Sequence, residues 1–264
     1  MIGIFDSGVG GLTVLRAMRA AYPSIDVVYF GDTKNAPYGS RNREELTALM
    51  VANIQFLLNH GATTIISACN SVSASLALSL YDVLSVRPDQ LIEMVGPCVN
   101  SFRDSPKRLA LCATVATIES GIYQNAFRMI GKDVIAFPIP ELASSIERGE
   151  GDEQYEKHIK AALASVPADM YEVLILGCTH YPLAIDSFRR VAGDKTLFDP
   201  AEAVAERVLR DLWPREMGYG TTKFYISKDS AQFRRLVKDL FPATESVIEV
   251  VSRYCSRSAT QGAS

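Results

Sequence analysis

Two cysteines stand in matching contexts and have side chains that could move protons. Cys69 follows the apolar run TTIISA and precedes NSVSA, and Cys178, 109 positions later, follows VLILG and precedes THYPL. A cysteine after an apolar run is usually a small buried hydrophobe. Here, however, polar residues supply hydrogen-bond donors beside each sulfur. A helix start at these points would also favour the thiolate over the thiol.

Two such thiols at equivalent strand ends could stand on opposite sides of one bound molecule. One sulfur, as thiolate, would take a proton from a carbon acid while the other, as thiol, delivers a proton to the opposite face and inverts the centre. Asp6 and His180 could carry protons to and from the sulfurs. The alternative is cysteine–histidine nucleophilic catalysis, as in thiol hydrolases. It is less favoured because residues two apart on a loop or early helix rarely share a face.

The segment FDSGVGGLTV places Asp6 and Ser7 between an apolar run and a glycine-rich turn. It is not a dinucleotide motif, because Thr13 stands where G-x-G-x-x-G requires glycine, and no Walker-type sequence occurs in the chain. Backbone N–H groups of such a turn can still hold a carboxylate. The alternative is a tight strand-to-helix turn in which Asp6 acts only as a cap.

The segment GDTKNAPYGSR follows the second apolar run. Pro37, Tyr38 and Gly39 would form a turn that presents a tyrosine and two backbone N–H groups to a cleft, although a plain loop is the alternative. Lys34 could form a Schiff base with pyridoxal phosphate, but no phosphate-binding pattern accompanies it. No cofactor is therefore expected.

The elements that must position these residues follow from alternating patterns. Short continuous apolar runs predict strands buried on both faces of parallel sheets, at residues 2–5, 26–31, 63–68, 91–96, 108–113, 133–138, 172–177, 195–199, 223–227 and 247–251. Apolar residues at helical spacing predict helices at 12–21, 43–59, 72–84, 122–130, 153–164 and 201–212. This alternation indicates an α/β fold, with mostly parallel sheets flanked by helices.

The spacing of the two cysteine segments suggests two similar α/β units. We expect residues 1–94 and 208–264 to form the first domain and residues 95–207 the second. Open α/β sheets bind ligands at the carboxyl ends of their strands. The polar residues at these ends are Asp6, Asp32, Cys69, Thr114, Cys178 and Asp199.

Composition narrows the partners. The chain has 264 residues, 48% of them hydrophobic, and a net charge of −3 without a long basic run, so nucleic acid and anionic membranes are not expected. No apolar stretch approaches the roughly 18 residues of a membrane span and no secretory signal is evident, which predicts a cytoplasmic protein. Five widely spaced cysteines and three histidines without ligand spacing predict neither disulfides nor a metal site.

Several segments together resemble the glutamate racemases of the cofactor-independent aspartate/glutamate racemase superfamily. The resemblance runs from residue 2 to about residue 250, through DSGVGGLTV, GDTKNAPYGSR, ACNSVSA, ATVATIES, IERGE, LGCTHYPL and KFYISKDSAQF. It implies interconversion of L- and D-glutamate without pyridoxal phosphate or metal, supplying D-glutamate for peptidoglycan and hence cell shape. It also implies two α/β domains with the site in the cleft between them, and a homodimer.

By this likeness Cys69 acts on the D enantiomer with Asp6 assisting, and Cys178 acts on the L enantiomer with His180 assisting. The resemblance implies that substrate contacts come from Asp6, Ser7, Pro37, Tyr38, Gly39, Asn70, Ser71, Thr114, Thr117, Thr179 and His180.

Three positions depart from the usual pattern of these racemases. Ser71 replaces a threonine and keeps its hydroxyl, Cys98 replaces a common glycine and Ile139 replaces a common cysteine. These changes bear on the packing of the cleft and leave the catalytic set intact.

The chain lacks the N-terminal extension of members that need a cell-wall precursor for activity or bind DNA gyrase, so we expect no regulation or a different one. Aspartate or another small carbon acid is an alternative substrate, and a non-catalytic amino-acid sensor or protein inhibitor is an alternative function.

Overall fold

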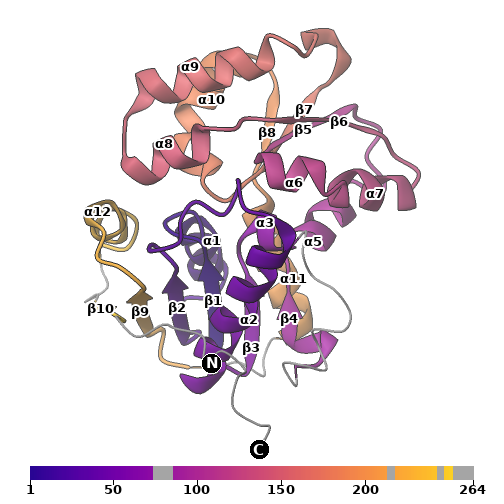
Figure 1. The fold of residues 1–264 in the computed structure, drawn as a ribbon. Coiled ribbons are helices and arrows are strands. Elements are labelled where there is room, and N and C mark those ends of the chain that lie inside the picture. Colours follow the sequence, from indigo (N-terminus) through magenta and orange to yellow (C-terminus); the bar gives the residue numbers. More distant parts are fainter. Residues whose placement is uncertain (74–85, 213–217, 243–246, 252–264) are drawn as a thin grey trace, which may run out of the picture.

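The computed structural model describes residues 1–73, 86–212, 218–242 and 247–251. Within these residues ten strands form two sheets in which every strand pair is parallel. Figure 1 shows the sheets in separate parts of the molecule, each with helices packed on it. The predicted α/β fold is confirmed. We call the six-stranded sheet and its helices the first half, and the four-stranded sheet and its helices the second half.

The first half is built on a sheet of strand order β10-β9-β2-β1-β3-β4. Its strands are β1 (Ile2–Asp6), β2 (Val27–Gly31), β3 (Thr64–Ser67), β4 (Leu91–Ile92), β9 (Thr222–Ile226) and β10 (Ile248–Val250). β1, β2 and β3 are buried along their whole length, as expected of continuous apolar runs. Phe5 pairs with Ser67 at the carboxyl ends of β1 and β3, which brings Asp6 and Cys69 out at the same edge.

The second half is built on a sheet of strand order β6-β5-β7-β8. Its strands are β5 (Leu109–Ala113), β6 (Val134–Pro138), β7 (Val173–Gly177) and β8 (Thr196–Phe198). Ala113 pairs with Gly177, so Thr114 and Cys178 leave adjacent strands at the same level.

The longer helices agree closely with the sequence pattern. The helices are α1 (Leu12–Ala21), α2 (Arg43–Asn59), α3 (Asn70–Ser73), α5 (Val95–Asn100), α6 (Val115–Glu119), α7 (Ile122–Met129), α8 (Leu142–Arg148), α9 (Asp152–Leu163), α10 (Ile185–Ala192), α11 (Pro200–Leu212) and α12 (Ala231–Leu240), with short 3₁₀ turns η1 (Pro88–Gln90), η2 (Ala168–Met170) and η3 (Tyr181–Ala184). Most of the helix predicted at 72–84 lies outside the described residues. The sequence pattern missed α5, α6, α8, α10 and α12.

One predicted strand is shorter than expected. The run 91–96 forms a strand only as far as Ile92. The Glu93 carboxylate then accepts hydrogen bonds from the backbone N–H groups of Val95 (2.5 Å) and Gly96 (2.7 Å), which begins α5. A carboxylate on the first free N–H groups of a helix favours the helix start over continued strand.

Each sheet is buried by helices on both faces. In the first half, α1, α11 and α12 pack on one face and α2 packs on the other. In the second half, α8, α9 and α10 cover one face and α5 and α7 the other.

The domain boundaries stay a prediction. Because α11 packs against α1, we propose that the chain returns to the first domain near residue 200 and not at 208.

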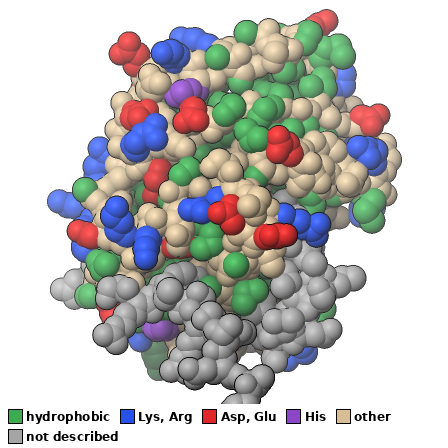
Figure 2. Space-filling model, viewed as in Figure 1, with side chains coloured by type: hydrophobic (Ala, Val, Ile, Leu, Met, Phe, Trp, Pro, Cys, Tyr) green, Lys and Arg blue, Asp and Glu red, His purple; other side chains and the backbone are tan. Residues whose placement is uncertain are grey.

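The surface agrees with the nearly neutral charge. On the face in Figure 2, basic and acidic side chains are interspersed among the described residues, without an extended basic patch. Among the helices of the described ranges, none combines the length and apolarity needed to cross a membrane.

Candidate active site

The carboxyl ends of both sheets meet at one small cavity. Its lining consists of Ser7, Pro37, Tyr38, Gly39, Cys69, Asn70, Ser71, Thr114, Ala143, Cys178, Thr179 and His180. All but Ala143 were predicted from the sequence. The free volume is about 10 Å³, close to the room that one water molecule needs. A larger ligand can therefore enter only if the two halves separate.

Both cysteines line this cavity, one from each half. Cys69 lies between β3 and α3, and Cys178 directly follows β7. Each side chain is 5% exposed, and neither forms a disulfide. Cys178 is one of the neighbouring groups that raise the pKa of Cys69. The structure thus gathers at one cavity the two thiols that the sequence paired across 109 positions.

The protonation of Cys69 differs from the sequence expectation. Burial raises the pKa of the Cys69 thiol far above its usual value, and the negative charge of Asp6 raises it further. The backbone N–H groups of Val72 and Ser71 lower this pKa, as expected at a helix start, but their effect is smaller. In this closed arrangement Cys69 is therefore a neutral thiol.

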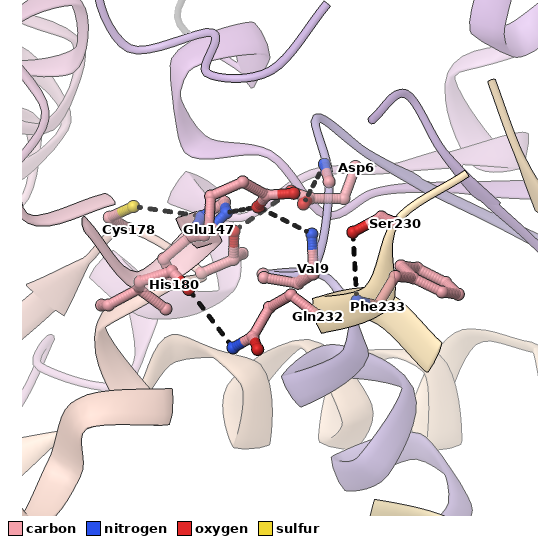
Figure 3. Close-up of polar contacts among 12 residues, drawn as sticks. Asp6, Val9, Glu147, Cys178, His180, Ser230, Gln232 and Phe233 are labelled. Atoms are coloured by element: carbon pink, nitrogen blue, oxygen red, sulfur yellow. Dashed lines mark hydrogen bonds and ion pairs between the residues drawn. The ribbon is translucent and has the colours of Figure 1, made fainter. Parts of the chain in front are cut away.

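His180 contacts Cys178 on one side and Glu147 on the other (Figure 3). Nδ1 lies 3.8 Å from the Cys178 sulfur and Nε2 lies 2.8 Å from Oε2 of Glu147. Burial alone would lower the pKa of His180, but the hydrogen bonds to Cys178 and Glu147 raise it well above its usual value. The expectation that residues 178 and 180 would not share a face is wrong. The turn that leads into η3 brings the two side chains together.

Asp6 lies immediately behind the lining and joins the two halves. Its carboxylate accepts hydrogen bonds from the backbone N–H of Gly8 (2.9 Å) and from the Thr179 hydroxyl (3.1 Å). Burial raises the pKa of Asp6, while the charge of His180 lowers it. Asp6 is thus close enough to influence the charges on both sides of the cavity.

Three buried hydroxyls form a cluster between the halves. Ser71 Oγ lies 2.9 Å from Thr114 Oγ1 and 3.4 Å from Thr117 Oγ1, and the two threonine oxygens are 3.0 Å apart. Ser71 comes from α3 and the threonines come from the start of α6. These hydroxyls can turn their hydrogens toward an anion when the cleft opens.

The turn at 37–39 contributes Pro37, Tyr38 and Gly39 to the cavity lining. The Tyr38 hydroxyl donates a hydrogen bond to Asp32 Oδ2 (2.6 Å), so Asp32 holds this turn and is not part of the cavity lining. A Cβ at Gly39 would lie 2.7 Å from Thr114, so only glycine allows this approach.

Asp199 does not reach the cavity either. Its carboxylate caps α11 by accepting a hydrogen bond from the Ala201 N–H (2.9 Å).

The glycine-rich turn after β1 packs against Glu147 and His180 of the second half. A Cβ at Gly8 would lie 2.4 Å from Glu147 Oε1, and a Cβ at Gly10 would lie 2.5 Å from His180 Nδ1. The backbone N–H of Val9 donates a hydrogen bond to Glu147 Oε2 (3.1 Å). A side chain at Gly8 or Gly10 would therefore displace the Glu147 carboxylate or the His180 ring from these positions.

Sequence reasoning missed the role of Glu147. This residue lies near the end of α8, one turn after Ala143 of the cavity lining. Its Oε2 binds both His180 of its own half and Val9 of the other half. The available signal was the segment IERGE, which contains Glu147 and belongs to the resemblance described above. The partner of Glu147 lies 33 positions away in the chain and became evident only in the fold.

Comparison with known proteins decides the family. Residues 12–208 match the Asp/Glu/Hydantoin racemase family, over most of the chain. The chain belongs to this family. Its resemblance to the glutamate racemases is confirmed as well. It is 34% identical to the glutamate racemase of Aquifex aeolicus over 239 residues, covering 90% of this chain and 92% of the relative.

Solved structures from the racemase family agree over nearly the whole chain. A glutamate racemase isoform from Bacillus anthracis superposes with a TM-score of 0.86 at 27% identity, covering 97% of this chain and 98% of the other. The glutamate racemase of Francisella tularensis, solved in complex with D-glutamate, superposes with a TM-score of 0.83 at 28% identity, covering 95% and 97%. The two-sheet architecture is therefore that of glutamate racemases.

Proposed function

We propose that the chain interconverts L- and D-glutamate by a two-base mechanism in which Cys69 and Cys178 exchange protons with opposite faces of the α-carbon. The observation that carries the proposal is the common cavity with one buried thiol from each half. A sensor of amino acids would have no use for the second thiol. The identity with named glutamate racemases over most of the chain supports glutamate as the substrate.

In the L-to-D direction, Cys178 as thiolate removes the α-proton from one face. The imidazole of His180 lies next to this sulfur, and its contacts with Cys178 and Glu147 raise the pKa of His180 well above its usual value. Cys69, which burial keeps as a thiol, gives its proton to the opposite face of the carbanion. One proton moves from carbon to the Cys178 sulfur, and one moves from the Cys69 sulfur to carbon. The D-to-L direction reverses both transfers, with Asp6 assisting Cys69.

Substrate binding is proposed to use the polar lining on all sides of the thiols. The hydroxyl cluster of Ser71, Thr114 and Thr117 and the amide of Asn70 supply donors for one carboxylate. The backbone of the 37–39 turn supplies donors for the other. The substrate ammonium is left to the oxygens of Asp6, Ser7 and Thr179. Closing around the substrate would exclude water and strengthen each of these interactions.

We further propose that the enzyme works as a homodimer in the cytoplasm, and that it supplies D-glutamate for peptidoglycan and cell shape. The family resemblance is the support for each of these points. No cofactor is part of the proposed scheme, because the two sulfurs themselves accept and donate the protons.

The test is α-proton exchange in deuterated water with purified protein free of pyridoxal phosphate. We expect both glutamate enantiomers to take up deuterium at the α-carbon and to interconvert, with aspartate reacting far more slowly. Failure to exchange either glutamate enantiomer would refute the proposal. Faster exchange of aspartate would replace the substrate, and tight glutamate binding without exchange would favour the sensor.

A further inference from the structure

We propose that Tyr123, a residue outside the cavity lining, is a positioning residue that orients the Asn70 amide toward a carboxylate of the substrate. This inference rests on the proposed racemase function and assigns a new residue to the same site. Tyr123 and Phe127 are the buried residues of α7 and lie four positions apart. This spacing is typical of ordinary core residues of a helix.

The observation that carries the inference is a short hydrogen bond between the two halves. The Tyr123 hydroxyl donates to Asn70 Oδ1 at 2.5 Å. Tyr123 is fully buried, and Asn70 is 2% exposed. Asn70 begins α3 in the first half, directly after Cys69, whereas Tyr123 belongs to α7 of the second half. The bond therefore exists only when the halves are together.

The other end of the Asn70 amide has no partner. Nδ2 is buried and has no hydrogen-bond partner among the described residues. Asn70 lines the cavity beside both cysteines. A buried amide donor without an acceptor is costly, and native proteins rarely retain one without a reason. A carboxylate oxygen of a substrate held between the thiols would satisfy it.

The direction of the Tyr123 bond fixes which end of the amide faces the ligand. If the amide were turned, Nδ2 would donate to Tyr123 and Oδ1 would face the substrate carboxylate and repel it. The Tyr123 hydroxyl would then need a second acceptor, and the described contacts of this residue include none besides Asn70. Burial raises the pKa of Tyr123 well above its usual value, and the nearby Cys98 and Glu93 raise it further. The hydroxyl thus stays a donor throughout the working pH range.

The experiment combines Tyr123→Phe with Asn70→Ala in a double-mutant cycle, measured as racemisation of glutamate. We expect Tyr123→Phe to raise KM by about tenfold, roughly one hydrogen bond, with kcat changed less than about twofold, because the lost contact is made equally in ground and transition states. In the Asn70→Ala background the same substitution should change KM no further.

Tyr181→Phe is the matched control, because its buried hydroxyl also donates one hydrogen bond, to the Ile139 carbonyl (3.1 Å). It should lose similar stability without the rise in KM. A wild-type KM for Tyr123→Phe, or equal effects of Tyr123→Phe with and without Asn70, overturns the inference. An inactive wild-type protein refutes the proposed function instead.

If Tyr123→Phe fails to fold, Asn70→Asp tests the inference instead. This variant keeps an acceptor for Tyr123 but presents a carboxylate oxygen where the amide donor stood. We expect KM to rise more than in Asn70→Ala, because like charges then face each other. A KM equal to the wild-type value overturns the inference.

Discussion

At the residue scale, the two thiols work in unequal surroundings. Cys69 is buried beside the carboxylate of Asp6, which favours its neutral form, whereas Cys178 has the charged His180 beside its sulfur. In the proposed L-to-D direction, the neutral Cys69 is the proton donor and Cys178 is the proton acceptor. The histidine depends in turn on Glu147, which holds Nε2 at 2.8 Å.

Glu147→Gln tests this dependence. The carboxylate helps to raise the pKa of His180, so its removal should lower that pKa. His180 is charged below its pKa and loses its charge as pH rises through it. The high-pH fall of kcat/KM should therefore move to lower pH in the variant, with kcat/KM at neutral pH reduced by about tenfold or more, the effect of one charged hydrogen bond.

Glu150→Gln is the control for this measurement. Glu150 lies in the same segment and binds Ser145 and Arg148, away from His180. Its substitution should leave the pH profile of kcat/KM unchanged. An unshifted pH profile of kcat/KM in Glu147→Gln would contradict the claim that Glu147 raises the pKa of His180.

Sequence reasoning predicted the lining residues well and their charges poorly. Both thiols could be identified from the sequence, because Cys69 and Cys178 each follow an apolar run and precede polar residues. The pKa of Cys69 depends on burial and on Asp6, which lies 63 positions earlier, and local sequence contains neither. Tyr123 and Glu147 were missed for the same reason, since their partners come from distant segments.

At the element scale, strands were more predictable than short helices. All ten apolar runs contain a strand. Continuous burial explains the pattern of β1, β2, β3, β5 and β7, whereas β6, β8, β9 and β10 are only partly buried. Three of the missed helices, α5, α6 and α8, have at most seven residues, too few for a firm helical period, whereas α10 and α12 are as long as the predicted α7 and α1. One of them, α8, carries Glu147 to the site. The sequence pattern predicted the turn between β1 and α1. It did not predict that the glycines of this turn pack against the second half.

Gly8→Ala tests this role of the turn. The added Cβ would lie 2.4 Å from Glu147 Oε1 and so keep Glu147 and the Val9 N–H apart. We expect kcat/KM to fall by about a hundredfold, since displacement of a catalytic group by about 1 Å can cost that much. Gly131→Ala is the control. Its positive φ of 72° costs stability, but nothing lies within 4 Å of the added Cβ. Normal activity in Gly8→Ala would contradict the proposed close approach.

At the scale of the whole molecule, the site exists only where the halves close. Contacts between the halves include Thr179 to Asp6, Ser71 to Thr114 and Gln232 of α12 to the Ile146 carbonyl. The sequence predicted two similar units and a cleft. It could not predict these contacts, because each joins segments between 43 and 173 positions apart. Catalysis then requires opening, entry and reclosure around a cavity that is about 10 Å³ when closed.

The central claim is that each thiol serves one face of the same α-carbon, and enantiomer-resolved deuterium uptake by Cys69→Ala and Cys178→Ala tests it most directly. Neither substitution should unfold the protein, because the deleted group is small. Interconversion should fall by at least about a thousandfold in both variants. Cys69→Ala should incorporate deuterium only into L-glutamate, and Cys178→Ala only into D-glutamate. Full interconversion by either variant, or the same enantiomer labelled by both, would contradict the account.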